Sequence, residues 1–144
     1  MSVPLLVVCP DCAATNRVPA ERLGNAPKCG RCKSALFQAR PVEVATPVFD
    51  RHVAAGALPA LVDFWAGWCG PCRQMAPAFA AASGDLEPRV RLLKVDTEAE
   101  TALANRYGIR SIPTLILFAD GRERARMSGA MDRASIVAWA RQQM

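Results

Sequence analysis

The pattern of apolar and polar positions from residue 47 onward predicts strands and helices that alternate along the chain. Residues 60–65 form a nearly continuous apolar run around one acid, Asp63, which is typical of a buried strand, and residues 90–95 and 114–118 also predict strands. Segments with helical spacing lie before, between and after these strands, at residues 47–55, 71–82, 97–107 and 133–143.

A hairpin signal completes this part of the chain. Asp120 and Gly121 follow the strand at 114–118 and precede another at 123–127, and an Asp-Gly pair is typical of a two-residue hairpin turn. Strands that alternate with helices and then end in a hairpin and a helix predict an α/β fold. We expect a mixed central sheet flanked by helices on both faces.

The first 37 residues have a different pattern, in which short apolar stretches are broken by Pro, Gly, Asn and Cys. Residues 5–8 and 16–18 predict two short strands that pair with each other. So small a segment cannot be held together by apolar burial alone and needs a cross-link, such as a disulfide or a structural metal ion. We therefore divide the chain into a front module at 1–37, a linker or first strand at 38–46, and a main domain at 47–144.

Composition excludes a disordered chain, because 51% of the 144 residues are hydrophobic. No apolar run approaches the roughly 18–20 residues that span a bilayer. The apolar stretch near Met1 is shorter than a secretory leader and lacks a positive charge before it. We therefore expect a cytoplasmic protein without a membrane partner. His52, the only histidine, is expected on the surface of the first predicted helix, with no role.

Positive charge is concentrated at the front of the chain. Residues 1–40 hold six basic and two acidic side chains, which gives +4 of the formal net charge of +5. A basic segment of this kind can bind nucleic acid. Four thiolates around a zinc ion would lower the charge of this segment to about +2. The signal for nucleic acid is therefore weak, and we do not expect such a partner.

The six cysteines form three Cys-x-x-Cys pairs, and spacing separates their roles. Cys9 and Cys12 are followed, after sixteen residues, by Cys29 and Cys32, which is the spacing of a four-cysteine zinc site with two knuckles. Four ligands fill the coordination sphere, so we expect one structural zinc ion per chain. A second redox dithiol, labile disulfides, or an iron site with the same ligands remain as alternatives.

The third pair, Cys69 and Cys72, lies where the strand at 60–65 gives way to the helix at 71–82. A sulfur at a helix start is close to unpaired amides and to the positive end of the helix dipole, which favours thiolate over thiol. Cys69 is then the attacking nucleophile, and Cys72, one turn further in, resolves the mixed disulfide. Gly70 lets a substrate backbone approach, and Pro71 suits the first helical turn; neither stabilises the thiolate, which predicts a reducing role. A purely structural disulfide is the alternative.

The stretch around this pair resembles the active site of the thioredoxin family. Residues 62–72 read Val-Asp-Phe-Trp-Ala-Gly-Trp-Cys-Gly-Pro-Cys, and further similarity covers residues 94–96, 107–114 and 128–130. The resemblance extends over essentially everything after position 41 and implies a thioredoxin fold. Gly67 is a small departure, because many members carry a charged or larger residue there.

The resemblance also implies roles for individual residues. Asp63 would be a buried carboxylate that exchanges a proton with Cys72, with Lys94 as its partner; a turn-capping aspartate and a solvated lysine are the alternatives. Pro113 matches the family's cis-proline, although an ordinary trans proline is the more common state of such a bond. The backbone of Ile112 would pair with an extended substrate segment. The remaining residues expected around the docking surface are Trp68, Gly70, Pro71, Gly129 and Ala130.

The front module, residues 9–37, is similar to the extension of the zinc-binding thioredoxin 2 subgroup. This resemblance implies a protein dithiol–disulfide oxidoreductase that reduces disulfides in client proteins and is recharged by thioredoxin reductase. The chain has no glycine-rich dinucleotide fingerprint, so NADPH and FAD would belong to that partner, and this chain would bind no organic cofactor. The alternative function is a binding or regulatory protein whose zinc ribbon acts as a redox switch.

Overall fold

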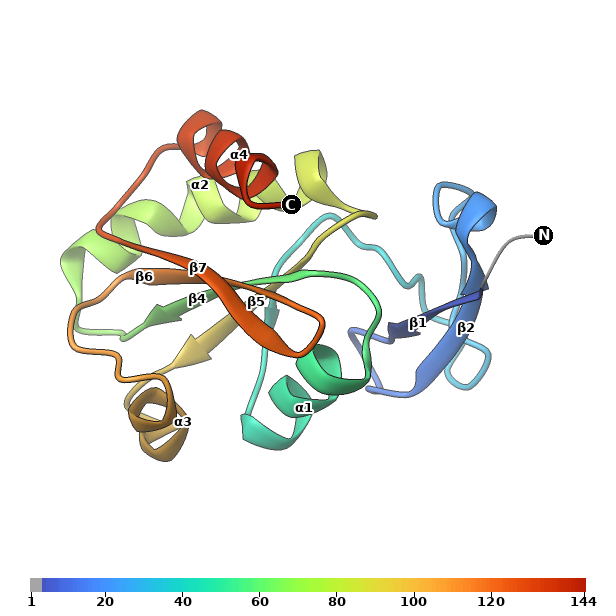
Figure 1. Ribbon diagram of the computed structural model, residues 1–144, viewed down its shortest axis with the longest axis horizontal. Helices are drawn as coiled ribbons and strands as arrows, with labels where there is room; N and C mark the ends of the chain where they lie inside the picture. Colours follow the sequence, from blue (N-terminus) through green and yellow to red (C-terminus); the bar gives the residue numbers. More distant parts are fainter. Residues whose placement is uncertain (1–3) are drawn as a thin grey trace.

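The computed structural model describes residues 4–144, and its first unit is a small antiparallel hairpin (Figure 1). β1 (Pro4–Val8) pairs with β2 (Thr15–Pro19), which confirms the two strands expected there. A short 3-10 turn at Ala20–Arg22 follows, and the chain then folds back through a second cysteine turn. Five buried residues form the core of this unit: Val7, Cys9, Val18, Cys29 and Leu36. Residues 1–3 of the predicted front module lie outside the described residues.

The second unit is built on a mixed five-stranded sheet, as the sequence predicts. The strand order is β3-β5-β4-β6-β7. β5 pairs in parallel with both β3 and β4, whereas β6 is antiparallel to β4 and β7 is antiparallel to β6. The bounds of these strands are β3 Val42–Glu43, β4 Ala60–Trp65, β5 Arg91–Asp96, β6 Thr114–Ala119 and β7 Arg122–Ser128.

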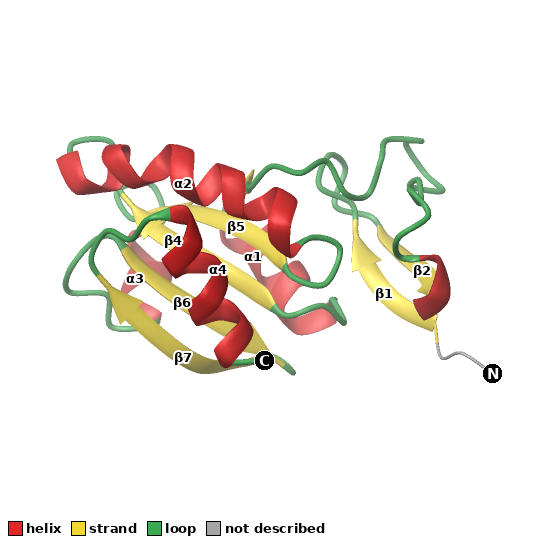
Figure 2. Cartoon of the chain, turned by 90° about the horizontal axis from the view of Figure 1, so that it is seen from above, coloured by secondary structure: helices red, strands yellow, loops and turns green. Residues whose placement is uncertain are grey.

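Helices cover both faces of this sheet (Figure 2). α2 (Gly70–Leu86) and α4 (Arg133–Gln142) pack on one face, where Met75 and Ile136 join the apolar side chains of the sheet. α1 (Thr46–Asp50) and α3 (Thr101–Arg106) lie on the other face. α1 continues into a wider π-helical turn at Arg51–Ala55. Along residues 4–144, no helix has both the length and the apolar character needed to cross a membrane.

Helix ends differ from the expected positions for local reasons. α3 begins at Thr101 rather than at residue 97, because the carboxylate of Asp96 accepts hydrogen bonds from the amides of Glu98 and Ala99 and holds these residues in a turn. α2 passes through Pro77 and ends at Leu86, four residues beyond the expected end.

The expectation for His52 is wrong, since only 4% of this residue is exposed. β1 packs against the π-helical turn that carries His52, and the amide of Ala57 donates to the carbonyl of Leu6 at 2.8 Å. Burial, with the nearby charge of Arg91, lowers the pKa of His52 to about 3, so the ring is neutral. The pattern of one helix cannot show that a separate module covers it.

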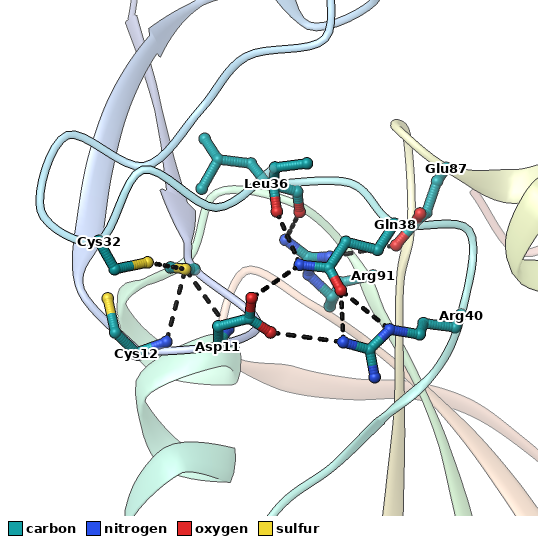
Figure 3. A network of polar contacts seen from close by, with 10 residues as sticks. Asp11, Cys12, Cys32, Leu36, Gln38, Arg40, Glu87 and Arg91 are labelled. Atoms are coloured by element: carbon teal, nitrogen blue, oxygen red, sulfur yellow. Dashed lines mark hydrogen bonds and ion pairs between the residues drawn. The ribbon is translucent and has the colours of Figure 1, made fainter.

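Arg91 joins the two units (Figure 3). It starts β5 and is only 2% exposed, yet its guanidinium donates to the carbonyls of Val8 and Leu36 at 3.0 and 2.8 Å. The same group forms an ion pair with Glu87 at 3.1 Å. Glu87 in turn accepts a hydrogen bond from the amide of Ala39 at 2.8 Å. One buried charge therefore fixes the front module and the linker on the sheet.

Replacement of Arg91 by alanine is expected to destabilise the protein by about 3–5 kcal/mol, because two carbonyls lose a hydrogen-bond donor and the buried carboxylate of Glu87 loses its counter-charge. Urea unfolding followed by circular dichroism measures this loss. Arg89→Ala is the matched control, since Arg89 is exposed and its side chain should matter by no more than about 0.5 kcal/mol. Equal stabilities of the two variants would contradict the assigned role of Arg91.

Candidate functional site

The Cys69–Cys72 pair lies at the start of α2, as the sequence predicts. Cys69 is the N-cap residue, and its Sγ accepts a hydrogen bond from the backbone N–H of Cys72 at 3.2 Å. The two residues are joined in a disulfide, and their Cα atoms are 5.3 Å apart. In this oxidised form both are buried, with 4% and 2% exposed, so accessibility alone does not distinguish them. The helix cap distinguishes the two cysteines, because the sulfur of Cys69 occupies the position where an amide and the helix dipole stabilise negative charge.

The cis-proline loop lies directly beside this sulfur. The peptide bond between Ile112 and Pro113 is cis, and the carbonyl oxygen of Ile112 is 3.8 Å from the Sγ of Cys69. The amide of Gly129 donates to the carbonyl of Pro113 at 2.9 Å, which ties the end of β7 to this loop. Gly129 has a φ of +103°, a conformation that a residue with a Cβ rarely adopts.

The rim of the site carries a large exposed aromatic ring. Trp68 is 68% exposed, and its Nε1 donates a hydrogen bond to the carboxylate of Glu98. Gly70 and Pro71 begin α2 immediately after Cys69, and Ala130 is an exposed residue after β7. Sequence reasoning missed Glu98, because nothing in its local pattern shows that the turn after β5 reaches Trp68.

Asp63 is buried without a hydrogen-bonding partner. It lies in the middle of β4, is 1% exposed, and neither carboxylate oxygen has a partner among residues 4–144. Burial raises its pKa to about 7; the charge of Lys94 opposes this rise and that of Glu43 reinforces it. A carboxyl group with such a pKa can accept and release a proton near neutral pH. The alternative of a turn-capping aspartate does not fit this position.

Lys94 is the neighbour of Asp63 on the adjacent parallel strand β5. Its Nζ is 4.5 Å from the centroid of the Trp65 ring, a cation–π geometry that keeps the ammonium group on the same side of the sheet. The Nε1 of Trp65 donates to the carboxylate of Glu43 at 3.2 Å. Glu43 was not among the predicted site residues, because its place depends on β3 pairing with β5.

The other four cysteines converge in the front module. The Sγ atoms of Cys9, Cys12, Cys29 and Cys32 all lie within 4.8 Å of one another, and the Cys9–Cys32 and Cys12–Cys29 pairs are each 3.6 Å apart. Sulfurs placed about 2.3 Å from a tetrahedral zinc ion would be about 3.8 Å apart, so these residues fit the metal.

Hydrogen-bond donors around the sulfurs favour the thiolate form, which is the form that binds a metal ion. The N–H groups of Asp11 and Arg31 donate to Cys9 and Cys29 respectively, each at 3.4 Å, and the Asn16 side chain donates to Cys29 at 3.5 Å. Hydrogen bonds, first from the backbone of Cys32, lower the pKa of Cys29 to about 6, whereas burial raises that of Cys9 to about 12. A divalent cation would favour the thiolate at both residues.

Comparisons with known proteins match both units. The profile of the family described as Thioredoxin matches residues 40–142, and that described as Thioredoxin 2, N-terminal, matches residues 8–34. Thioredoxin C-3 of Corynebacterium nephridii is 42% identical over 140 residues, which are 97% of this chain and 96% of that protein. Thioredoxin of Rickettsia bellii is 41% identical over 91 residues, which are 63% of this chain and 87% of that protein.

A solved structure is similar in three dimensions as well. A mutant thioredoxin from Halobacterium salinarum superposes with a TM-score of 0.66 at 29% identity and covers 73% of this chain and 91% of its own. The predicted thioredoxin fold is thereby confirmed. The chain belongs to the thioredoxin family of thiol–disulfide oxidoreductases and has the amino-terminal zinc-ribbon module of the thioredoxin 2 subgroup.

Proposed function

We propose that this protein reduces disulfides in other proteins, with Cys69 as the nucleophile. The observation that carries the proposal is the hydrogen bond from the Cys72 amide to the Sγ of Cys69 at the start of α2. In the reduced protein the same amide would stabilise a Cys69 thiolate. Cys72 lies inside the first turn of the helix, within bonding reach of the Sγ of Cys69, which suits the resolving thiol.

The reaction transfers two electrons in two steps. The Cys69 thiolate attacks one sulfur of the client disulfide, forms a mixed disulfide, and releases the other client sulfur as a thiolate that takes a proton. Cys72 then loses its proton and attacks the Sγ of Cys69. The second client sulfur leaves, the client is reduced to a dithiol, and Cys69 and Cys72 are oxidised to the disulfide seen in the structure.

We assign Asp63 as the group that exchanges a proton with Cys72. Its carboxyl titrates near neutral pH because it is buried, and no other residue of the described chain holds its oxygens by a hydrogen bond. Lys94 supports the ionised form of Asp63 from the neighbouring strand. A base with this pKa can take the proton from Cys72 in the resolving step and return it when the pair is next reduced.

Docking of the client rests on the surface around Cys69. The backbone of Ile112 lies beside the reactive sulfur and can pair with an extended client segment. Trp68 offers an exposed apolar ring at the rim. The other residues we place at this surface are Gly70, Pro71, Pro113, Gly129 and Ala130.

The partners and the metal follow from the family. We infer that a thioredoxin reductase carrying NADPH and FAD recharges the pair and that the clients are cytoplasmic disulfide-containing proteins. We assign a single structural zinc ion to Cys9, Cys12, Cys29 and Cys32, whose thiolates would leave no position for water or substrate. The ion would supply folding energy that the small front module lacks.

Replacement of Cys69 by serine is expected to lower the rate of insulin reduction by dithiothreitol to the uncatalysed level, because the attacking sulfur is gone. Turbidity of the released insulin chains measures the rate. Cys72→Ser is the informative partner variant: it should still attack and should accumulate a mixed disulfide, visible by mass spectrometry. Full activity of Cys69→Ser would refute the mechanism.

Stability should depend on pH through Asp63. Burial raises the pKa of Asp63 to about 7 in the folded protein, whereas the unfolded chain loses this proton near the ordinary pKa of 3.8. The folded state therefore binds more protons between these values, and stability falls as pH rises through this window. Asp63→Asn should remove this fall and be more stable than the wild type at pH 8, by up to about 4 kcal/mol. Urea unfolding at pH 4 and pH 8 measures it.

The exposed acid Asp120, at the hairpin turn, provides the control. Asp120→Asn removes the same charge and should leave the pH dependence of the wild type intact. A pH dependence of Asp63→Asn equal to that of the wild type would show that Asp63 titrates normally.

Metal analysis tests the front module. The protein should contain one zinc ion per chain, which a mercurial thiol reagent releases and a colorimetric chelator detects. Cys29→Ser should lose the zinc and the order of β1 and β2, because a tetrahedral site lacks one of its four ligands. Its insulin reductase activity should remain well above that of Cys69→Ser. A content far from one zinc per chain would contradict the tetrathiolate site.

A further inference from the structure

Three charged residues, Glu43, Lys94 and Asp63, lie side by side on neighbouring strands of the sheet, and the family resemblance assigns no role to Glu43. β5 pairs with β3 on one side and with β4 on the other, and Lys94 is the residue at the centre. Its lateral partners are Glu43 on β3 and Asp63 on β4. Laterally paired residues of parallel strands point to the same face of the sheet. Two carboxyl groups therefore flank one ammonium group on one face.

This face is the one that α2 covers. Leu61 lies two residues before Asp63 in β4, so the two side chains point the same way, and Leu61 packs in one cluster with Met75 and Phe79 of α2. Trp65, two residues after Asp63, also points this way and packs against the cluster that contains Cys69 and Cys72. The charged row is thus on the same side as the redox pair.

Trp65 fixes Glu43 and Lys94 relative to each other. Its Nε1 donates to the carboxylate of Glu43 at 3.2 Å, and its ring lies 4.5 Å from the Nζ of Lys94. Partial burial of the Glu43 carboxylate raises the pKa of this group as well. Glu43 is thus an exposed residue whose carboxylate is held by Trp65 next to Lys94, the residue that pairs with Asp63.

We propose that Glu43 is a positioning residue for the proton-transfer step, whose negative charge offsets that of Lys94 and thereby favours the protonated form of Asp63. This inference rests on the proposed role of Asp63. With Lys94 alone, one positive charge would face one carboxyl group and favour its ionised form. With Glu43 present, two carboxyl groups share one positive charge, and the more deeply buried of the two, Asp63, keeps the proton.

The other groups packed around Asp63 do not supply this effect. The residue paired with Asp63 on β6 is Leu115, which is apolar. On α2 the ionisable member of the site is Cys72, which is held in the disulfide in the oxidised protein and does not titrate there. Asp96 lies two residues after Lys94 on β5; its carboxylate accepts hydrogen bonds from the amides of Glu98 and Ala99, and its charge acts on Glu43. The charges that act on Asp63 itself in this state are those of Lys94 and Glu43.

The test is a titration of the Asp63 carboxyl carbon by NMR in the oxidised protein. Glu43→Gln keeps an oxygen that can accept the hydrogen bond of Trp65 and removes only the charge. The midpoint of Asp63 should fall by about half a pH unit to one pH unit, as expected for loss of a like charge two strands away. Asp120→Asn, which removes the same charge from a distant exposed turn, should leave the midpoint unchanged.

The pH dependence of the resolving step gives a second readout. After single-turnover formation of the mixed disulfide, the acid limb of the release rate should move to lower pH in Glu43→Gln by the same amount as the NMR midpoint. An unchanged midpoint in Glu43→Gln, or an equal fall in Asp120→Asn, would overturn the inference. Insulin reduction by the wild type is measured separately, so failure of the reductase proposal and failure of the Glu43 proposal have different signatures.

Discussion

A hydrogen bond from a helical amide to one sulfur organises the active site. The amide of Cys72 can reach the Sγ of Cys69 because Cys69 is the N-cap residue of α2, and that position follows from the direct passage of β4 through a short turn into the helix. The same turn places the second thiol one helical turn deeper. The cis-proline loop then brings the carbonyl oxygen of Ile112 to 3.8 Å from the Sγ of Cys69. The positions of the proposed nucleophile and of the proposed resolving thiol are both set by where one helix begins.

Arg91 and Asp63 are both buried ionisable residues, and the desolvation of their charge is compensated at Arg91 but not at Asp63. Arg91 is fully supplied with partners: two carbonyls of the front module and the carboxylate of Glu87. It remains charged and acts as a structural tie. Asp63 has no hydrogen-bonding partner in the described chain, so burial shifts its titration toward neutral pH. Its burial costs stability at pH values where the carboxyl group is ionised, and it suits the proton-transfer role proposed for this residue.

Sequence reasoning predicted what depends on local pattern and failed where distant segments meet. The sheet, the helix start at Cys69, and the convergence of four cysteines follow from periodicity and spacing, and the structure bears them out. The burial of His52 was missed because its cover is β1, from another module. The tie through Arg91 and the place of Glu43 depend in the same way on pairings between segments roughly fifty residues apart. Pattern along one element carries no information on such contacts.

The start of α2 is expected to ionise the sulfur of Cys69 in the reduced protein. The most direct measurement is the rate at which iodoacetamide alkylates Cys69 in the reduced protein as a function of pH, with the modified residue identified by peptide mass spectrometry. We expect the rate to reach half its maximum at least about one pH unit below the pKa of about 8.5 of a free cysteine. A half-maximal rate at the pH typical of a free thiol would contradict it.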